Sequence, residues 1–158
     1  MNRAQILVLV LCGSVLFIDG FDAQSMGFVA PALVQQLHLA RAALGPVFSS
    51  GLVGIMIGAL VFGPLADRVG RKPILVWCTL LFGVFSLLTA TAGSLHGLLL
   101  YRLFTGFGLG GAMPNAVALT SEFMPERFRA TAVTVMFVGF AVGAAAGGFV
   151  AAGLIPRF

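Results

Sequence analysis

The chain has 158 residues, of which 59% are hydrophobic and 9% are charged, and its mean hydropathy is +1.08. An average soluble domain is about 25% charged, so this composition predicts an integral membrane protein and argues against a soluble one. The net charge of +4 does not indicate nucleic-acid binding, because the basic residues lie in gaps between apolar runs and form no stripe with aromatic residues. Two isolated cysteines, Cys12 and Cys78, give neither a metal-binding spacing nor a disulfide framework. No metal and no cofactor are expected.

Five apolar runs are long enough to cross a membrane, since a spanning helix needs about 20 mostly apolar residues. They are predicted over residues 5–32, 44–66, 73–93, 97–120 and 130–155. Runs this continuous do not fit the alternating pattern of a membrane barrel, so the predicted fold is an all-α membrane bundle. The first run follows Arg3 as a signal peptide would, but it continues past Asp22 without a prompt cleavage site. It is therefore interpreted as an uncleaved first span.

The basic residues between the runs predict how the protein is oriented. With the N-terminus inside, six Lys or Arg residues lie on the cytoplasmic side and two on the outer side, in agreement with the positive-inside rule. The inner set is Arg3, Arg68, Arg71, Lys72, Arg127 and Arg129, and the outer set is Arg41 and Arg157. The sequence thus predicts a multi-pass membrane protein with a cytoplasmic N-terminus.

Two acidic residues, Asp19 and Asp22, lie inside the first run. A carboxylate in hydrocarbon is unfavourable by roughly 2.5–3.5 kcal/mol even on the mildest insertion scale, so such residues usually serve a function. At about 1.5 Å per residue, Asp19 and Arg102 of the fourth run both lie about 21–22 Å from the inner edge. We expect these buried charges to be partners. The alternative is that Arg102 extends outward to the lipid headgroups.

Glycines recur every four residues in three of the runs. This spacing places them on one helix face, where they let two helix backbones approach closely. The sets are Gly54 and Gly58, then Gly106 and Gly110, and finally Gly139, Gly143 and Gly147.

The connection between the second and third runs reads Gly63-Pro-Leu-Ala-Asp67-Arg68-Val-Gly70-Arg71-Lys72. It resembles the signature loop of the major facilitator superfamily, and the run from Arg102 to Gly110 resembles that superfamily's fourth-span motif. The resemblance implies that Asp67 and Arg71 form a charged latch with Glu122, which holds the outward-facing state and breaks when the helices rock.

A finer resemblance lies in Asp19-Gly-Phe-Asp22 and the following Met26-Gly-Phe-Val-Ala-Pro31, which is similar to the first span of the aromatic acid:proton symporter family. Three further stretches share this similarity: Leu44-Gly-Pro46, Met113-Pro-Asn115 and Ser121-Glu-Phe-Met-Pro-Glu126. The fifth run resembles an antiporter motif except that Ala144 replaces its proline, which favours symport.

The resemblance implies a transporter of the bacterial inner membrane that couples protons to a small aromatic carboxylate such as 4-hydroxybenzoate. It covers the first five spans of twelve, so the chain is interpreted as an incomplete N-terminal half that lacks the C-terminal half of the carrier. Arg102 would bind the substrate carboxylate as a two-pronged partner. Protonation of Asp19 or Asp22 would release Arg102 for that role.

Other functions stay open. The same scaffold fits transport of another organic acid, a sugar or a drug, and the chain also fits a truncated membrane protein that does not transport. An enzyme is not expected, because no nucleophile–base pair or metal-ligand spacing is present, and His38 and His96 lie near outer loops.

Overall fold

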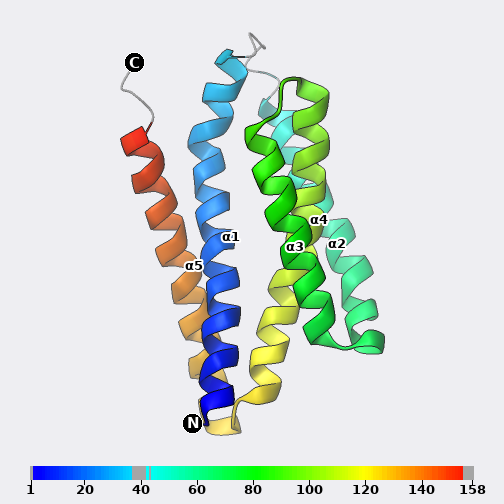
Figure 1. The fold of residues 1–158 in the computed structure, drawn as a ribbon, viewed down its shortest axis with the longest axis vertical. Coiled ribbons are helices and arrows are strands. Elements are labelled where there is room, and N and C mark those ends of the chain that lie inside the picture. The colour runs from blue at the N-terminus through cyan, green and yellow to red at the C-terminus, as the bar shows by residue number, and fades with distance from the viewer. Residues whose placement is uncertain (1, 37–41, 43, 155–158) are drawn as a thin grey trace. The chain divides into compact units, whose positions relative to one another are not determined.

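The computed structural model describes residues 2–36, 42 and 44–154, and all its regular structure there is helical. Five helices follow one another through these residues (Figure 1): α1 (Arg3–Gln36), α2 (Leu44–Val69), α3 (Arg71–Ala90), α4 (Leu95–Phe123) and α5 (Glu126–Leu154). Arg41 and Arg157, the predicted outer basic residues, and His38, predicted near an outer loop, lie outside the described residues.

Four of the described helices, α1, α2, α3 and α5, are long and apolar enough to cross a membrane. Five spans were predicted. That count is wrong, because α4 is not among the helices that are long and apolar enough to cross a membrane. The 29-residue helix α4 carries an arginine, a proline and several glycines and hydroxyl residues in place of aliphatic ones. Much of α4 is shielded by protein, as the buried positions Thr105, Gly106, Gly108, Leu109, Gly110, Gly111, Ala112, Asn115, Ala116 and Thr120 show. A helix face that contacts protein does not need the hydropathy that lipid requires.

The chain folds into two compact units. One joins Met1–Val29 to Ala116–Phe158, and the other is Ala30–Asn115. We call them the α1–α5 unit and the α2–α3–α4 unit, after the helices that dominate each.

In the α1–α5 unit, α1 and α5 lie side by side and run in the same direction (Figure 1). Three glycines of α5 each face a main-chain carbonyl oxygen of α1, in the same order along both helices: Gly139 at Gly13, Gly143 at Phe17, and Gly147 at Phe21. A Cβ on Gly20 of α1 would in turn overlap the carbonyl oxygen of Phe140 on α5. The two backbones are therefore in direct contact, which side chains larger than hydrogen would prevent.

In the α2–α3–α4 unit, α2 and α4 also run in the same direction and touch through glycines. A Cβ on Gly106 would overlap the carbonyl oxygen of Gly51, and one on Gly110 would overlap that of Ile55. From the other side, Gly54 faces the carbonyl of Leu103 and Gly58 faces that of Phe107. In a multi-pass protein the chain reverses its direction with each successive span, so every second helix runs the same way. The parallel pairs α1–α5 and α2–α4 both fit this rule.

Helix α3 packs antiparallel against α4 through aromatic rings and a second glycine contact. The Phe85 ring is stacked on Phe104, with centroids 4.8 Å apart, and lies 6.3 Å from the Tyr101 ring. Further along, a Cβ on Gly108 would lie 2.7 Å from the carbonyl oxygen of Cys78. Helix α4 thus contacts α2 on one side and α3 on another.

Candidate functional site

The first candidate residue, Asp19, lies on the buried stripe of α1. Its side chain is 8% exposed, and Cys12, Leu16 and Met26 are buried on the same stripe. Asp22, three residues later, is half-buried. Asp19 lies 16 residues after Arg3, which is roughly 24 Å along the helix. The carboxyl group is therefore near the middle of the 34-residue helix α1, where a charge in a membrane span needs a specific reason to be kept.

The second candidate residue, Arg102 of α4, lies against the surface of α2 at Gly51. A Cβ built on Gly51 would be 3.8 Å from both Nε and Nη2 of Arg102 and 3.8 Å from its carbonyl oxygen. The Nε atom is buried, whereas the residue as a whole is half-buried. The guanidinium stem is thus covered by α2, and part of the group remains accessible.

An apolar cluster closes the α2–α3–α4 unit one helical turn before Arg102. It consists of Val47, Ala92 and Leu98, with Leu95, Leu99 and Tyr101 packed against it. Val47 and Leu98 are fully buried. An arginine that extended toward the first turn of α4 would have to pass this cluster, so the packing favours an inward-facing guanidinium over the headgroup alternative.

The acids and the arginine belong to different units. Asp19 and Asp22 are in the α1–α5 unit, and Arg102 is in the α2–α3–α4 unit. Their pairing therefore stays a prediction.

The turn between α2 and α3 is built around one glycine. Gly70 has a φ of 104°, a backbone conformation that residues with a Cβ rarely adopt. Its N–H donates to the carbonyl of Ala66 at 2.9 Å. Helix α2 ends at Val69 because the backbone at Gly70 turns the chain into α3.

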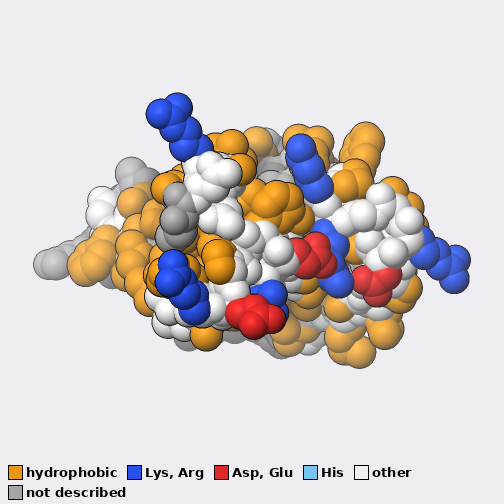
Figure 2. All heavy atoms as spheres, turned by 90° about the horizontal axis from the view of Figure 1, so that it is seen from below, with side chains coloured by type: hydrophobic (Ala, Val, Ile, Leu, Met, Phe, Trp, Pro, Cys, Tyr) orange, Lys and Arg blue, Asp and Glu red, His pale blue; other side chains and the backbone are white. Residues whose placement is uncertain are grey.

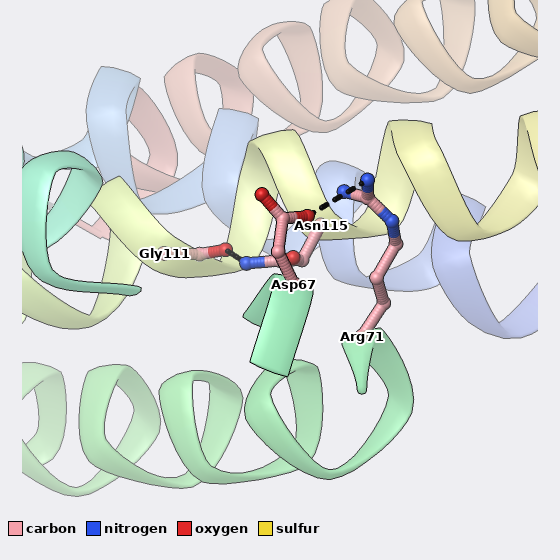
Figure 3. Close-up of polar contacts among 4 residues, drawn as sticks. All are labelled: Asp67, Arg71, Gly111 and Asn115. Carbon is pink, nitrogen blue, oxygen red and sulfur yellow. Dashed lines mark hydrogen bonds and ion pairs between the residues drawn. The ribbon is translucent and has the colours of Figure 1, made fainter. Parts of the chain in front are cut away.

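Across this turn, Arg71 Nη2 lies 3.2 Å from Asp67 Oδ1 in an i,i+4 ion pair (Figure 3). The Asp67 side chain is 66% exposed and that of Arg71 is 31% exposed, so solvent screens the pair and it contributes little to stability. Arg68 and Lys72 are exposed at the same turn. Glu122, expected as the third member of the latch, is in the other unit, and its participation stays a prediction.

Apart from Asp19, Asp22 and Arg102, the charged residues that the structure describes lie at or near helix ends. On the face seen in Figure 2, Lys, Arg, Asp and Glu side chains are interspersed among apolar ones. In the α1–α5 unit, the parallel helices bring Arg3 to the same end as the first turn of α5, which contains Glu126, Arg127 and Arg129. The Arg127 guanidinium carbon there lies 4.5 Å from the centroid of the Phe128 ring.

The sequence reasoning did not predict the helix contacts of four glycines, namely Gly20, Gly51, Gly108 and Gly111, although Gly20 and Gly108 lie in stretches that carry the family resemblance. Each faces a neighbouring helix: Gly20 contacts α5, Gly51 contacts Arg102, Gly108 contacts the α3 backbone, and Gly111 contacts Cys78 and Phe62. Gly51 precedes Gly54 by three residues, and Gly108 and Gly111 are three apart. The three-residue spacing, which also places residues on one helix face, was the signal that a search for four-residue spacing missed.

A buried amide stabilises α4 at its internal proline. Asn115 is 2% exposed, and its Nδ2 donates to the carbonyl of Gly111 at 2.7 Å (Figure 3). The preceding residue, Pro114, lies inside α4 and has no N–H for the helix ladder. The carbonyl that loses its ladder partner is that of Gly110, so the amide adds a hydrogen bond at the neighbouring carbonyl of Gly111.

No group of three or more His, Cys, Asp or Glu side chains that could hold a metal ion occurs in the part of the chain that the structure describes.

Residues 12–158 match the family model described as Major Facilitator Superfamily. The chain belongs to this superfamily. It is 51% identical, over 158 residues, to the 4-hydroxybenzoate transporter PcaK of Pseudomonas putida, covering 100% of this chain and 35% of that relative. It is 49% identical over 158 residues to the transporter of the same name from Acinetobacter baylyi, again with 100% and 35% coverage. It is also 49% identical over 153 residues to a gallate transporter of Pseudomonas putida, covering 97% of this chain and 34% of the relative.

These matches confirm the resemblance to the superfamily and to its aromatic acid transporters. Together with the apolar helices α1, α2, α3 and α5, they make the chain a multi-pass membrane protein. The chain spans about a third of the length of these curated relatives.

Proposed function

We propose that this chain is part of a proton-coupled symporter of small aromatic carboxylates, with 4-hydroxybenzoate as the leading substrate. The observation that carries the proposal is the roughly half-identical match, along the whole chain, to transporters named for 4-hydroxybenzoate. Because the chain spans 35% of the length of those relatives, the pathway in this proposal is completed by the further helices of a full carrier.

In this proposal Arg102 binds the substrate carboxylate. A guanidinium matches a carboxylate in a two-pronged geometry that a lysine ammonium does not provide. The packing of Arg102 on Gly51, with a buried Nε and an apolar cluster one turn away, supports this role. A half-buried guanidinium excludes bulk water from part of the ion pair and so strengthens it.

Asp19 and Asp22 carry the coupling proton in this scheme. While both are carboxylates, they compete with the substrate for Arg102. When one takes up a proton, Arg102 becomes available to the anion, and the proton and the anion then move inward together. The deep burial of Asp19 supports this assignment, because a charge held there outside a coupling cycle would be unfavourable.

We also propose that the turn at Asp67, Gly70 and Arg71 holds one conformation of the carrier, with Glu122 as an additional partner. The observed ion pair across the turn supports this role. An exposed pair of this kind typically contributes about 0.2–1 kcal/mol. That is weak enough to break within a transport cycle.

The test is proton-driven uptake of labelled 4-hydroxybenzoate in cells that express the gene containing this chain. Asp22→Asn and Arg102→Ala are expected to abolish uptake at unchanged expression. Matched controls are Glu126→Gln and Arg127→Ala, which remove the same charges from the first turn of α5 and should leave uptake intact. Normal proton-driven uptake in both Asp22→Asn and Arg102→Ala would contradict the proposed roles of these residues.

A second candidate substrate of the same class, gallate, is favoured by a specific observation, the 49% identity to a gallate transporter. Gallate and 4-hydroxybenzoate share the carboxylate and differ in ring hydroxyls. Competition of labelled 4-hydroxybenzoate uptake by unlabelled gallate, glucose and non-aromatic acids separates these cases. Stronger competition by gallate than by 4-hydroxybenzoate itself would reassign the leading substrate.

We further propose the bacterial inner membrane as the location, with the N-terminus in the cytoplasm. The parallel α1 and α5 place Arg3, Arg127 and Arg129 at one end of their unit, which agrees with the positive-inside rule. A single cysteine introduced at Lys72 should be labelled by an impermeant maleimide only after the membrane is opened. Labelling of intact cells at this position would reverse the orientation.

A further inference from the structure

Helix α2 carries no side chain at the point where it meets the proposed anion site. Gly51 is buried, and the nearest atoms to a Cβ at this position would all belong to Arg102: Nε, Nη2 and the carbonyl oxygen, each at 3.8 Å. The Cα–Cβ direction of Gly51 therefore points at the arginine.

The main chain leaves little freedom for this contact to shift. The carbonyl oxygen of Gly51 fills the space that a Cβ on Gly106 would need, and Gly54 faces the carbonyl of Leu103 in the same way. Gly106 is one turn after Arg102 on the same face of α4. The helices are thus in backbone contact on one side of the guanidinium, and the apolar cluster that contains Val47 and Leu98 lies one turn earlier along both helices.

The geometry points to Gly51 as a positioning residue for the guanidinium of Arg102, and so for the carboxylate of the substrate. This inference rests on the proposed function. The missing side chain lets Nε and Nη2 of the guanidinium lie beside the α2 backbone at Gly51. Side-chain volume at residue 51 then decides how far the guanidinium extends and whether it can meet a carboxylate with two hydrogen bonds.

The contact distances predict a graded response to volume. An alanine Cβ at 3.8 Å would be in ordinary van der Waals contact, so Gly51→Ala fits without movement. A γ atom extends about 1.5 Å further and falls inside the contact distance of Nε or Nη2, so a larger side chain displaces the guanidinium. By contrast, one methyl group at Gly54 collides with the main chain of Leu103. It perturbs the helix packing but adds no atom beside the guanidinium.

The experiment compares how the carrier recognises an acid and its neutral amide. Binding of 4-hydroxybenzoate and of 4-hydroxybenzamide to the purified full carrier is measured by calorimetry, which does not require transport, for the wild type and for Gly51→Ala, Gly51→Cys, Gly51→Val, Gly54→Ala and Arg102→Ala. Loss of one of two charge-assisted hydrogen bonds lowers the preference for the acid over the amide by about tenfold. We expect this loss in Gly51→Val, a smaller one in Gly51→Cys, and an unchanged preference in Gly51→Ala and Gly54→Ala.

The preference separates positioning from folding, because a merely structural defect weakens the acid and the amide alike. An unchanged preference in folded Gly51→Val overturns the inference, as does an equal loss in Gly54→Ala. If Gly51→Val is not recovered folded, Gly51→Cys decides, since its single γ atom must still lower the preference. An unchanged preference in Arg102→Ala refutes the proposed function itself. Loss in Arg102→Ala without loss in the Gly51 variants refutes only the role of Gly51.

Discussion

Replacement of Gly143 by alanine tests whether α1 and α5 are held together through their backbones. A Cβ on Gly143 would overlap the carbonyl oxygen of Phe17 and lie 2.8 Å from its carbonyl carbon. Both are main-chain atoms, so no rotamer change relieves the overlap. Non-bonded carbon atoms settle at about 3.5–4.0 Å, so the two helices must separate by about 1 Å along their contact.

Gly139 provides a matched control on the same face of the same helix, one turn earlier. The nearest atom to its Cβ would be the carbonyl oxygen of Gly13 at 3.4 Å, which is an acceptable contact. Both substitutions gain the same helix propensity, about 1 kcal/mol for glycine to alanine, so this gain cancels in their difference. The remainder is the overpacking term, about 1–3 kcal/mol, and main-chain overlap places Gly143→Ala toward its upper end.

The assay is the thermal unfolding of the purified protein in detergent, followed by circular dichroism. A difference of about 2–3 kcal/mol corresponds to a Tm roughly 5–10 °C lower for Gly143→Ala than for Gly139→Ala. A second pair repeats the comparison on α1, where Gly20→Ala collides with Phe140 and Gly27→Ala meets no atom within 4 Å. Equal Tm values within each pair would refute the close contact of α1 and α5.

Two further predictions concern the turn between α2 and α3. Gly70→Ala places a Cβ at a φ of 104° and should destabilise the protein by about 1–3 kcal/mol, seen as a lower Tm; Gly63→Ala, with nothing within 4 Å of its Cβ, is the control that should not lower the Tm. Asp67→Asn removes an exposed ion pair and should change the stability by less than about 1 kcal/mol while uptake of 4-hydroxybenzoate falls. A Tm decrease of several degrees with normal uptake would make the pair structural and remove it from the proposed latch.

Sequence reasoning identified which helices form and which residue types are unusual in them, because both depend on composition along the chain. It could not identify helix partners, which depend on the fold. Gly139 and Gly143 have the same spacing and the same glycine-rich surroundings, yet only Gly143 faces a carbonyl that excludes a methyl group. The two glycines differ because α1 and α5 lie slightly farther apart at Gly139 than at Gly143. The spacing of residues in the sequence does not encode this distance.

The fourth run shows the complementary limit. Its length and average apolarity predicted a span, but α4 is not among the helices that are long and apolar enough to cross a membrane. Its glycines Gly106, Gly108 and Gly110 contact α2 or α3, and the sequence alone does not reveal these contacts. Asp19 and Asp22 were also equivalent in the sequence. The structure separates them, since Asp19 is buried and Asp22 is half-buried, and only the packing around α1 could rank them.

One helix joins the proposed anion site to the charged turn. Helix α2 presents Gly51 to Arg102 and ends at the turn that holds Asp67, 16 residues later, which is roughly 24 Å along the axis. The glycine contacts at Gly54 and Gly58 prevent α2 from sliding along α4 without main-chain collisions, so this part of α2 and Arg102 must move as one body. Pro64 interrupts the hydrogen-bond ladder of α2 between Gly58 and the turn. Bending is therefore easiest beyond the glycine contacts, where the turn can rearrange while the guanidinium stays in place.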